Sequence, residues 1–434
     1  MKPPIPSNPQ AAAPHSGVPG VVDHLFRRES GRLVAILARR FGGDRLRVAE
    51  DAIQDALLRA MQIWPFQGIP ENPSAWILRV ACHRALDHVR HDQVGRGKIP
   101  QLEALAEDCL AASSGEATPR FEGEIRDSQL RMMFACCHPG LSVESQIALT
   151  LKVLCGFGER EIAAAFLEGE SAIAKRLVRA RQFLREQKVA VELPPVEELR
   201  CRVDAVLQAL YLLFNEGYKA SHGDSLLRRD LCEDAIRLGE LLVAHRLGDR
   251  PSTHALLALM YFNAARLPAR TGVDGGSLRL SEQERALWDM ELARKGSVHL
   301  AASAVGNELT RFHLEAGIAA CHALAANNGA TDWERILSLY DSLIALHPSP
   351  IVALNRAVAL ARVRGPAKGL DSLASMPGRA SIEGYYLLHV VEGQLWLDAG
   401  EPAKTTVSLR KAHALAVVEP ERRELERRLT EAQA

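Results

Sequence analysis

The sequence has no surplus of charge of either sign, because 53 Lys and Arg residues balance 53 Asp and Glu residues. Contact with nucleic acid would therefore depend on local basic patches and not on the chain as a whole. The sequence also has no apolar run near the ~20 residues that a membrane-spanning helix needs. Its first 20 residues are rich in proline and lack the apolar core of a signal peptide. We therefore expect a cytoplasmic protein without membrane contact, and a disordered segment over residues 1–20.

Sequence signatures of catalysis and of metal binding are missing as well. The eight cysteines include no CxxC pair, so we expect reduced and mostly buried thiols. No GxxxxGK[ST], GxGxxG or GxSxG motif occurs in a suitable context. His83, His88 and His91 are five and three residues apart, which spreads them around a helix instead of gathering them on one metal ion. We expect no enzymatic activity, no cofactor and no metal site.

Apolar residues recur three and four positions apart, and alternating β-branched runs are missing, so the chain is predicted to be all-α. Its length suits two to four domains. Helices are expected over 21–41, over 44–64 with Pro65 as the stop, and over 74–92 with Ser74 as the N-cap. Residues 93–126 lose the period and indicate a linker with a short helix at 102–110. Helices resume over 127–188.

Pro194 and Pro195 predict a second boundary, and residues 196–434 follow it. Within them, Pro366-Ala367-Lys368 recurs as Pro402-Ala403-Lys404 after 36 positions. A two-helix repeat of about 34 residues is the tetratricopeptide pattern. The alternative is a helical bundle that does not repeat.

Residues 158–188 carry the sharpest local signal, a short helix, a turn and a second helix that contains six basic residues and one acidic residue from 171 onwards. The second helix has an apolar stripe that can pack on the first helix and a basic stripe that is free to enter a major groove. The apolar stripe holds Ile173, Leu177, Ala180 and Leu184, and the basic stripe holds Ala172, Lys175, Arg176 and Arg179. This is helix-turn-helix geometry. The alternative is a solvated basic face on a structural helix.

The segment from 49 to 90 adds two further faces. Asp51, Gln54 and Asp55 make an acidic, polar face beside an apolar one, which suits a protein partner better than DNA. Downstream, a helix packs through Leu78, Ala81, Ala85 and Val89 and presents Arg79, His83, Asp87 and Arg90 on another face that can meet DNA.

The order of these segments resembles the extracytoplasmic-function group (group four) of bacterial sigma factors in the sigma-70 family. The family's AED-x-x-Q-[DE] helix, which binds the clamp helices of RNA polymerase, is similar to Ala49-Glu50-Asp51 through Gln54-Asp55 and Arg59-Ala60. The helix that reads the −10 element is similar to the run from Trp76 to Arg90. The region 4 helix that reads the −35 element is similar to Glu161-Ile162-Ala163 through Arg179-Ala180-Arg181.

The resemblance implies a region 2 bundle at 21–92, a linker at 93–126, a region 4 helix-turn-helix at 127–190, a subgroup-specific helical domain at 196–290 and tetratricopeptide-like repeats at 291–434. It implies core RNA polymerase as partner, through the β′ clamp and the β flap, together with promoter DNA and a regulatory protein on the repeats. The implied polymerase-binding residues are Asp51, Gln54, Asp55 and Arg59. The implied −10 residues are Arg79, His83, Arg84, His88 and Arg90, and the implied −35 residues are Ser171, Ala172, Lys175, Arg176, Arg179 and Arg181.

This sequence departs from the family pattern at three positions. His83 stands where Asn is usual and Cys82 where Arg is frequent, which puts the −10 preference in doubt. Ala174 replaces a common Lys in the −35 helix.

The C-terminal half narrows the resemblance. The runs 211–218 and 269–274 are similar to those of sigma factors that carry a large tetratricopeptide-like extension, typically lack a dedicated membrane anti-sigma factor and are controlled in part by the extension. Asn215, Glu216 and Tyr218 are predicted to cluster with Arg270 and Asp274, either as a polar pocket or as a buried structural network.

A stand-alone helix-turn-helix activator with a tetratricopeptide-type sensor is the competing interpretation. Such a protein needs only the module at 158–188. It has no use for the segment at 49–90, which therefore discriminates between the two functions.

Overall fold

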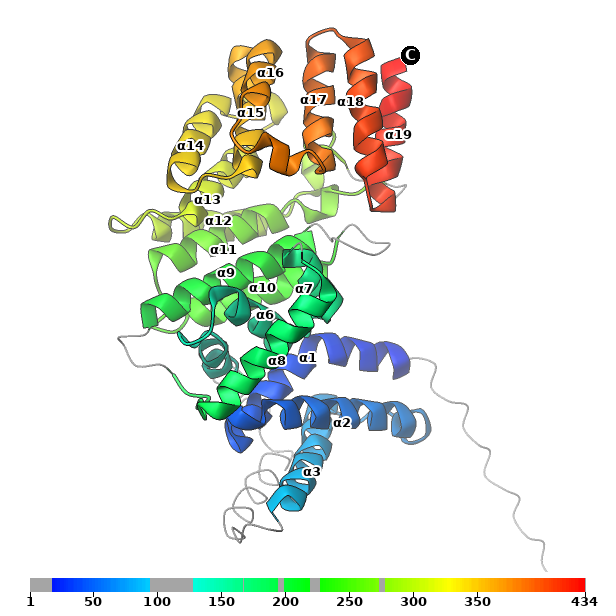
Figure 1. The fold of residues 1–434 in the computed structure, drawn as a ribbon, viewed down its shortest axis with the longest axis vertical. Coiled ribbons are helices and arrows are strands. Elements are labelled where there is room, and N and C mark those ends of the chain that lie inside the picture. The colour runs from blue at the N-terminus through cyan, green and yellow to red at the C-terminus, as the bar shows by residue number, and fades with distance from the viewer. Residues whose placement is uncertain are drawn as a thin grey trace, which may run out of the picture. The chain divides into compact units, whose positions relative to one another are not determined.

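The computed structural model describes residues 18–93, 128–166, 168–193, 199–218, 227–272 and 278–433. Within these ranges the chain forms α-helices and short 3-10 turns without a β-strand, which confirms the prediction of an all-α protein (Figure 1). The chain divides into two compact units, 1–209 and 210–434. None of the helices in the described ranges has the length and apolar character needed to cross a bilayer.

The first unit begins with three α-helices and one 3-10 turn. Helix α1 begins at Val18, so residues 18–20 are helical and not part of a disordered lead. Helix α2 runs through Pro65 in its last turn, where the missing N–H costs a single helical bond. It ends at Gln67, and the C-cap residue Gly68 has a φ of 84°. The elements are α1 (Val18–Phe41), η1 (Gly43–Arg45), α2 (Leu46–Gln67) and α3 (Pro73–Gln93).

Helix α3 is capped by a residue other than the predicted Ser74. The Asn72 side chain accepts a hydrogen bond from the Ala75 N–H at 3.0 Å, and Pro73 takes the first helical position, where no N–H is needed. The helices join through an apolar core in which Trp64 is 1% exposed. Its ring meets Trp76 edge to face at 5.4 Å between centroids.

The second part of the first unit contains helices in the range 127–188, where the sequence predicts them. Residues 128–136 are helical, and α6 (Val143–Leu154), α7 (Glu159–Phe166) and α8 (Glu170–Glu186) follow. Helix α8 packs on both α6 and α7. Its buried residues are Ile173, Leu177, Ala180 and Leu184, which confirms the predicted apolar stripe. The predicted linker at 93–126 and its helix at 102–110 lie outside the described residues, apart from Gln93 at the end of α3.

Two glycines let the two parts of the first unit approach closely. A Cβ atom on Gly31 of α1 would lie 2.3 Å from the carbonyl oxygen of Leu154, and one on Gly43 would lie 2.4 Å from that of Val189. Any larger residue would therefore push α1 away from α6, or η1 away from the end of α8.

The second unit starts within α9 (Leu199–Tyr218), since the division between the two units falls inside this helix. Helix α11 is buried on almost every side because α10, α12 and α13 pack around it. After α9, the elements of the second unit up to residue 330 are α10 (Arg229–Val243), α11 (Pro251–Ala264), η2 (Leu267–Ala269), η3 (Arg285–Leu287), α12 (Met290–Ser303), α13 (Arg311–Ala323) and η4 (Asn328–Ala330).

The remaining helices pack in sequence order, each against the next. Pro366 and Pro402 open α16 and α18, so the 36-residue spacing connects equivalent positions in two helix pairs. In each pair a small residue of the first helix, Ala357 or Gly393, lies directly against the second helix. The elements are α14 (Trp333–Leu346), α15 (Pro350–Arg364), α16 (Pro366–Ala374), η5 (Arg379–Ile382), α17 (Tyr386–Asp398), α18 (Pro402–Leu415) and α19 (Glu419–Gln433).

Candidate functional site

The outer face of α2 presents the four residues predicted to bind polymerase. Asp51, Gln54, Asp55 and Arg59 are all exposed. Arg47 lies 3.7 Å from Asp51, one helical turn away, in a solvent-exposed ion pair. Such a pair contributes little to stability, so Arg47 by itself does not keep Asp51 from a partner.

Sequence reasoning missed three large apolar residues on the same helix. Leu58 is 58% exposed, Met61 47% and Phe66 80%. Apolar side chains gathered on one exposed stretch of a helix are typical of a protein-binding surface. The sequence did carry a signal for this surface. Ile53, Leu57 and Trp64 belong to the buried stripe of α2, so apolar residues outside that stripe had to lie on its exposed side.

The predicted −10 residues lie on two sides of α3. Arg79 and His83 are exposed together, and His83 Nδ1 lies 2.8 Å from the Arg79 carbonyl oxygen. Arg84 and His88 instead face α2, where they line a hollow of about 210 Å³ with Asp51, Asp55 and Asp87. The side chain of Arg90 lies outside the described residues. Two of the predicted DNA-binding residues are therefore neighbours of the predicted polymerase-binding carboxylates.

The exposed face of α8 carries four of the predicted −35 residues. Ser171, Ala172, Lys175 and Arg179 are exposed, and the helix starts at Glu170 with Gly169 as its N-cap. Two positive charges one turn apart on an open helix face can contact phosphates or base edges.

Arg176 is not free on this face, contrary to the predicted basic stripe. Its Nη2 atom donates to both carboxylate oxygens of Glu168 at 2.9 Å. Its guanidinium also lies 5.3 Å from the centre of the Phe166 ring. Arg176 therefore joins the two helices of the helix-turn-helix, because its long side chain reaches back across the turn between them.

Arg181 is also held by a carboxylate. Its Nη2 atom lies 2.8 Å from Oε1 of Glu50 on α2. The pair borders a cleft of about 930 Å³. Predicted polymerase-binding and DNA-binding residues line this cleft together, namely Asp51, Gln54, His88 and Arg181.

The buried thiol of Cys136 interacts with both charges of this ion pair and is neutral. Burial raises the pKa of Cys136 well above its ordinary value, Cys137 and Glu50 raise it further, and Arg181 opposes them. Cys136 is therefore protonated at neutral pH, as expected of a structural cysteine.

The predicted polar cluster of the second unit forms in part. The Arg270 guanidinium lies over the Tyr218 ring at 3.6 Å and donates to the Tyr218 carbonyl oxygen. Burial lowers the pKa of Arg270, and Glu216 is buried nearby in sequence on α9. Asp274 lies outside the described residues.

Comparison with known proteins assigns the first part of the chain. Residues 25–94 match the family described as sigma-70 region 2, and residues 202–304 match a family of unknown function (DUF6596). The region 2 match supports a sigma-70 family sigma factor and a role with RNA polymerase in transcription initiation.

An uncharacterized protein of Rhizobium meliloti (strain 1021) is 35% identical over 372 residues, which cover 86% of each chain. This chain belongs to the same family as that protein. No solved structure matches the chain described here.

Proposed function

We propose that this chain is an extracytoplasmic-function sigma factor that binds core RNA polymerase through α2, reads the −10 element with α3 and the −35 element with α8, and carries a tetratricopeptide-like extension that modulates its activity. The observation that carries the proposal is the exposed face of α2. In a region 2 domain, Asp51, Gln54 and Asp55 lie there beside the exposed apolar side chains of Leu58 and Met61. An apolar centre with a charged rim suits a protein interface.

The helix-turn-helix supports the DNA-binding part of the proposal. Lys175 and Arg179 stay exposed on α8, while Arg176 ties α8 to Glu168 in the preceding turn and to Phe166 of α7. A helix held in this way can enter a major groove with its basic face outward. The competing activator function would leave the sigma-70 region 2 match at 25–94 unexplained.

The extension is proposed to act as a protein-binding array. Two helix pairs, α15 with α16 and α17 with α18, repeat the same proline start at a spacing of 36 residues. Stacked helix pairs commonly build an extended surface for a partner.

Run-off transcription with core polymerase tests the proposal, with and without the protein. A second experiment measures binding directly. Asp51→Arg with Asp55→Arg should abolish co-purification with core polymerase and leave the helical circular-dichroism signal intact. Glu284→Arg with Glu334→Arg is the matched control, since both residues are exposed in the second unit and the change in charge is the same. Unchanged co-purification of the Asp51 and Asp55 variant would remove the assignment of α2.

A further inference from the structure

The Glu50–Arg181 ion pair joins two segments 131 positions apart in the sequence. One belongs to the helix proposed to bind polymerase, and the other to the helix proposed to read DNA. The exposed fractions of the two side chains are 14% for Glu50 and 21% for Arg181, so water screens the pair only in part. Both charges also act on the buried thiol of Cys136, in opposite directions.

The ion pair does not stand alone. Gly31 places α1 directly against the last residues of α6, and Gly43 places η1 against the residues that follow α8. Helix α8 and η1 are in contact, as are α1 and α6. Backbone approaches of this kind make a packed interface and not a chance meeting of two long side chains.

This interface conflicts with the proposed DNA-bound state. Elements centred near −10 and −35 are about 25 base pairs apart, or about 85 Å along B-DNA at ~3.4 Å per base pair. Helix α3 packs on α2, so α3 cannot lie at one element and α8 at the other while Glu50 of α2 holds Arg181 of α8. In addition, the same contact uses the charge of Arg181 that a phosphate would need.

We propose that the Glu50–Arg181 contact is an autoinhibitory latch, which holds α8 across a cleft from Asp51 and Gln54 of the polymerase-binding face and opens when the chain joins core polymerase and promoter DNA. The inference rests on the proposed function. Asp51 and Gln54 line the same cleft as Arg181 and Gln182. A polymerase helix that binds α2 therefore competes with α8 for one surface.

The test separates the closed arrangement from its effect on polymerase binding. A photo-crosslinking amino acid at Gln182, which is exposed and lines the cleft, reports whether α8 lies against residues 43–54 in the full-length free protein. The crosslink should form in the otherwise unchanged chain, be lost with Arg181→Glu, and return with Glu50→Arg combined with Arg181→Glu. Arg181→Gln, which removes the charge without adding a repulsive one, should weaken it.

Affinity for core polymerase is then measured for variants of α8 alone, so that α2 stays intact. Arg181→Glu should raise the affinity about twofold to fivefold, the range expected when such an ion pair no longer competes. Lys188→Glu is the matched control, because this exposed residue lies two positions beyond the end of α8 and makes no contact with Glu50. Its affinity for core polymerase should stay unchanged.

Three other results are informative. No crosslink in the unchanged chain would show that the closed arrangement is absent in solution, which overturns the latch. A crosslink with equal polymerase affinities for Arg181→Glu and Lys188→Glu would show that the contact does not inhibit, which also overturns it. If no form of the chain binds core polymerase, the proposed function fails and the latch fails with it, whatever the crosslink reports.

Discussion

His254 on α11 and His299 on α12 face each other through their Nδ1 atoms, which lie 2.8 Å apart. Only one proton fits between two nitrogens at this distance. His254 Nε2 also lies 2.9 Å from Asp249 Oδ1, and the His299 ring stacks on Tyr261, whose hydroxyl group donates to Glu240. The interface between the two helices therefore tolerates one protonated imidazole and not two.

This pair predicts a loss of stability in acid. Burial lowers the pKa of His299, His254 and Lys295 lower it further, and Glu240 opposes them. Because the folded-state pKa lies below the unfolded value of about 6.5, the contribution is complete above that pH and is lost as the pH falls through the folded-state pKa. Thermal unfolding from pH 7.5 to 5 should show a melting temperature that falls less steeply in His299→Gln. The exposed His347→Gln is the control, and equal slopes in all three proteins would contradict the prediction.

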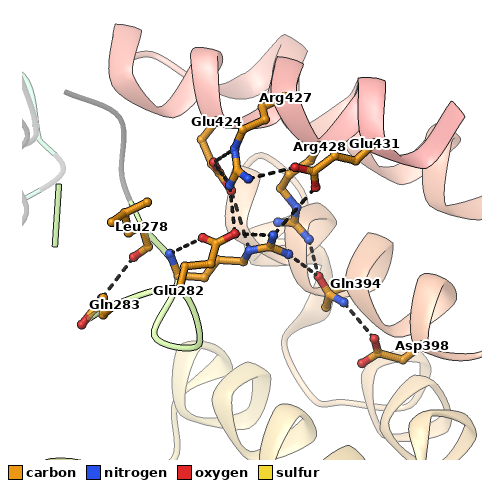
Figure 2. A network of polar contacts seen from close by, with 10 residues as sticks. Leu278, Glu282, Gln283, Gln394, Asp398, Glu424, Arg427, Arg428 and Glu431 are labelled. Atoms are coloured by element: carbon orange, nitrogen blue, oxygen red, sulfur yellow. Dashed lines mark hydrogen bonds and ion pairs between the residues drawn. The ribbon is translucent and has the colours of Figure 1, made fainter. Parts of the chain in front are cut away.

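The C-terminal helix α19 is held by a second polar network (Figure 2). Arg427 lies 3.0 Å from Glu282, and Arg428 donates to Gln394 at 2.7 Å. Burial opposes ionisation of Glu282, but hydrogen bonds from Arg279 and Arg427 prevail and lower its pKa to about 2.

Removing the charge of Glu282 should therefore destabilise the second unit. We expect Glu282→Gln to lower the free energy of unfolding by about 1.5 to 3 kcal/mol, the scale of hydrogen bonds to charged groups. Urea unfolding followed by circular dichroism measures it, with the exposed Glu284→Gln as control. Since the folded-state pKa is depressed, the stabilisation is present above about pH 4.5 and is lost as the pH falls toward 2. A difference between the variant and the unchanged chain that persists undiminished at pH 2 would argue against this account.

The two arginines one turn apart on α8 should behave differently. Arg179→Ala should weaken binding to −35 DNA by about 1 to 3 kcal/mol if the side chain reads a base, with the loss confined to matching sequences. Arg176→Ala should in addition lower the melting temperature, because it removes the contacts of α8 with Glu168 in the turn and with Phe166 of α7. Fluorescence anisotropy on matched and scrambled duplexes distinguishes these effects. A uniform loss for Arg179→Ala would make it a phosphate contact, and no loss for either variant would refute the helix-turn-helix function.

Cutting the chain near Pro194 should change promoter-dependent transcription strongly if the extension modulates activity. The structure refines where the cut belongs. The Arg202 guanidinium donates to the Phe134 carbonyl oxygen at 3.0 Å, so a fragment of residues 1–193 loses a buried contact that residues 1–209 keep. We expect 1–209 to melt at the higher temperature and both fragments to differ in transcription from the full chain. Transcription at full-length level by both fragments would exclude modulation by the extension.

Much of this protein was determined by local sequence. Ile173, Leu177, Ala180 and Leu184 are buried as predicted, because a helical stripe follows from a period of about 3.6 residues that the chain carries by itself. The exposure of Asp51, Gln54 and Asp55 follows from the same period. The motifs at 49–90 that resemble region 2 of a sigma factor are likewise contiguous, and the region 2 family match at 25–94 covers them.

Tertiary structure decided which charged side chains have partners. Arg176 and Arg179 are alike in sequence, yet one binds Glu168 and the other stays exposed. Arg181 meets Glu50 from across 131 positions, and no helical period can indicate a partner on another helix. The strength of an ion pair depends on the distance and the burial of both atoms, and these exist only once the helices have packed.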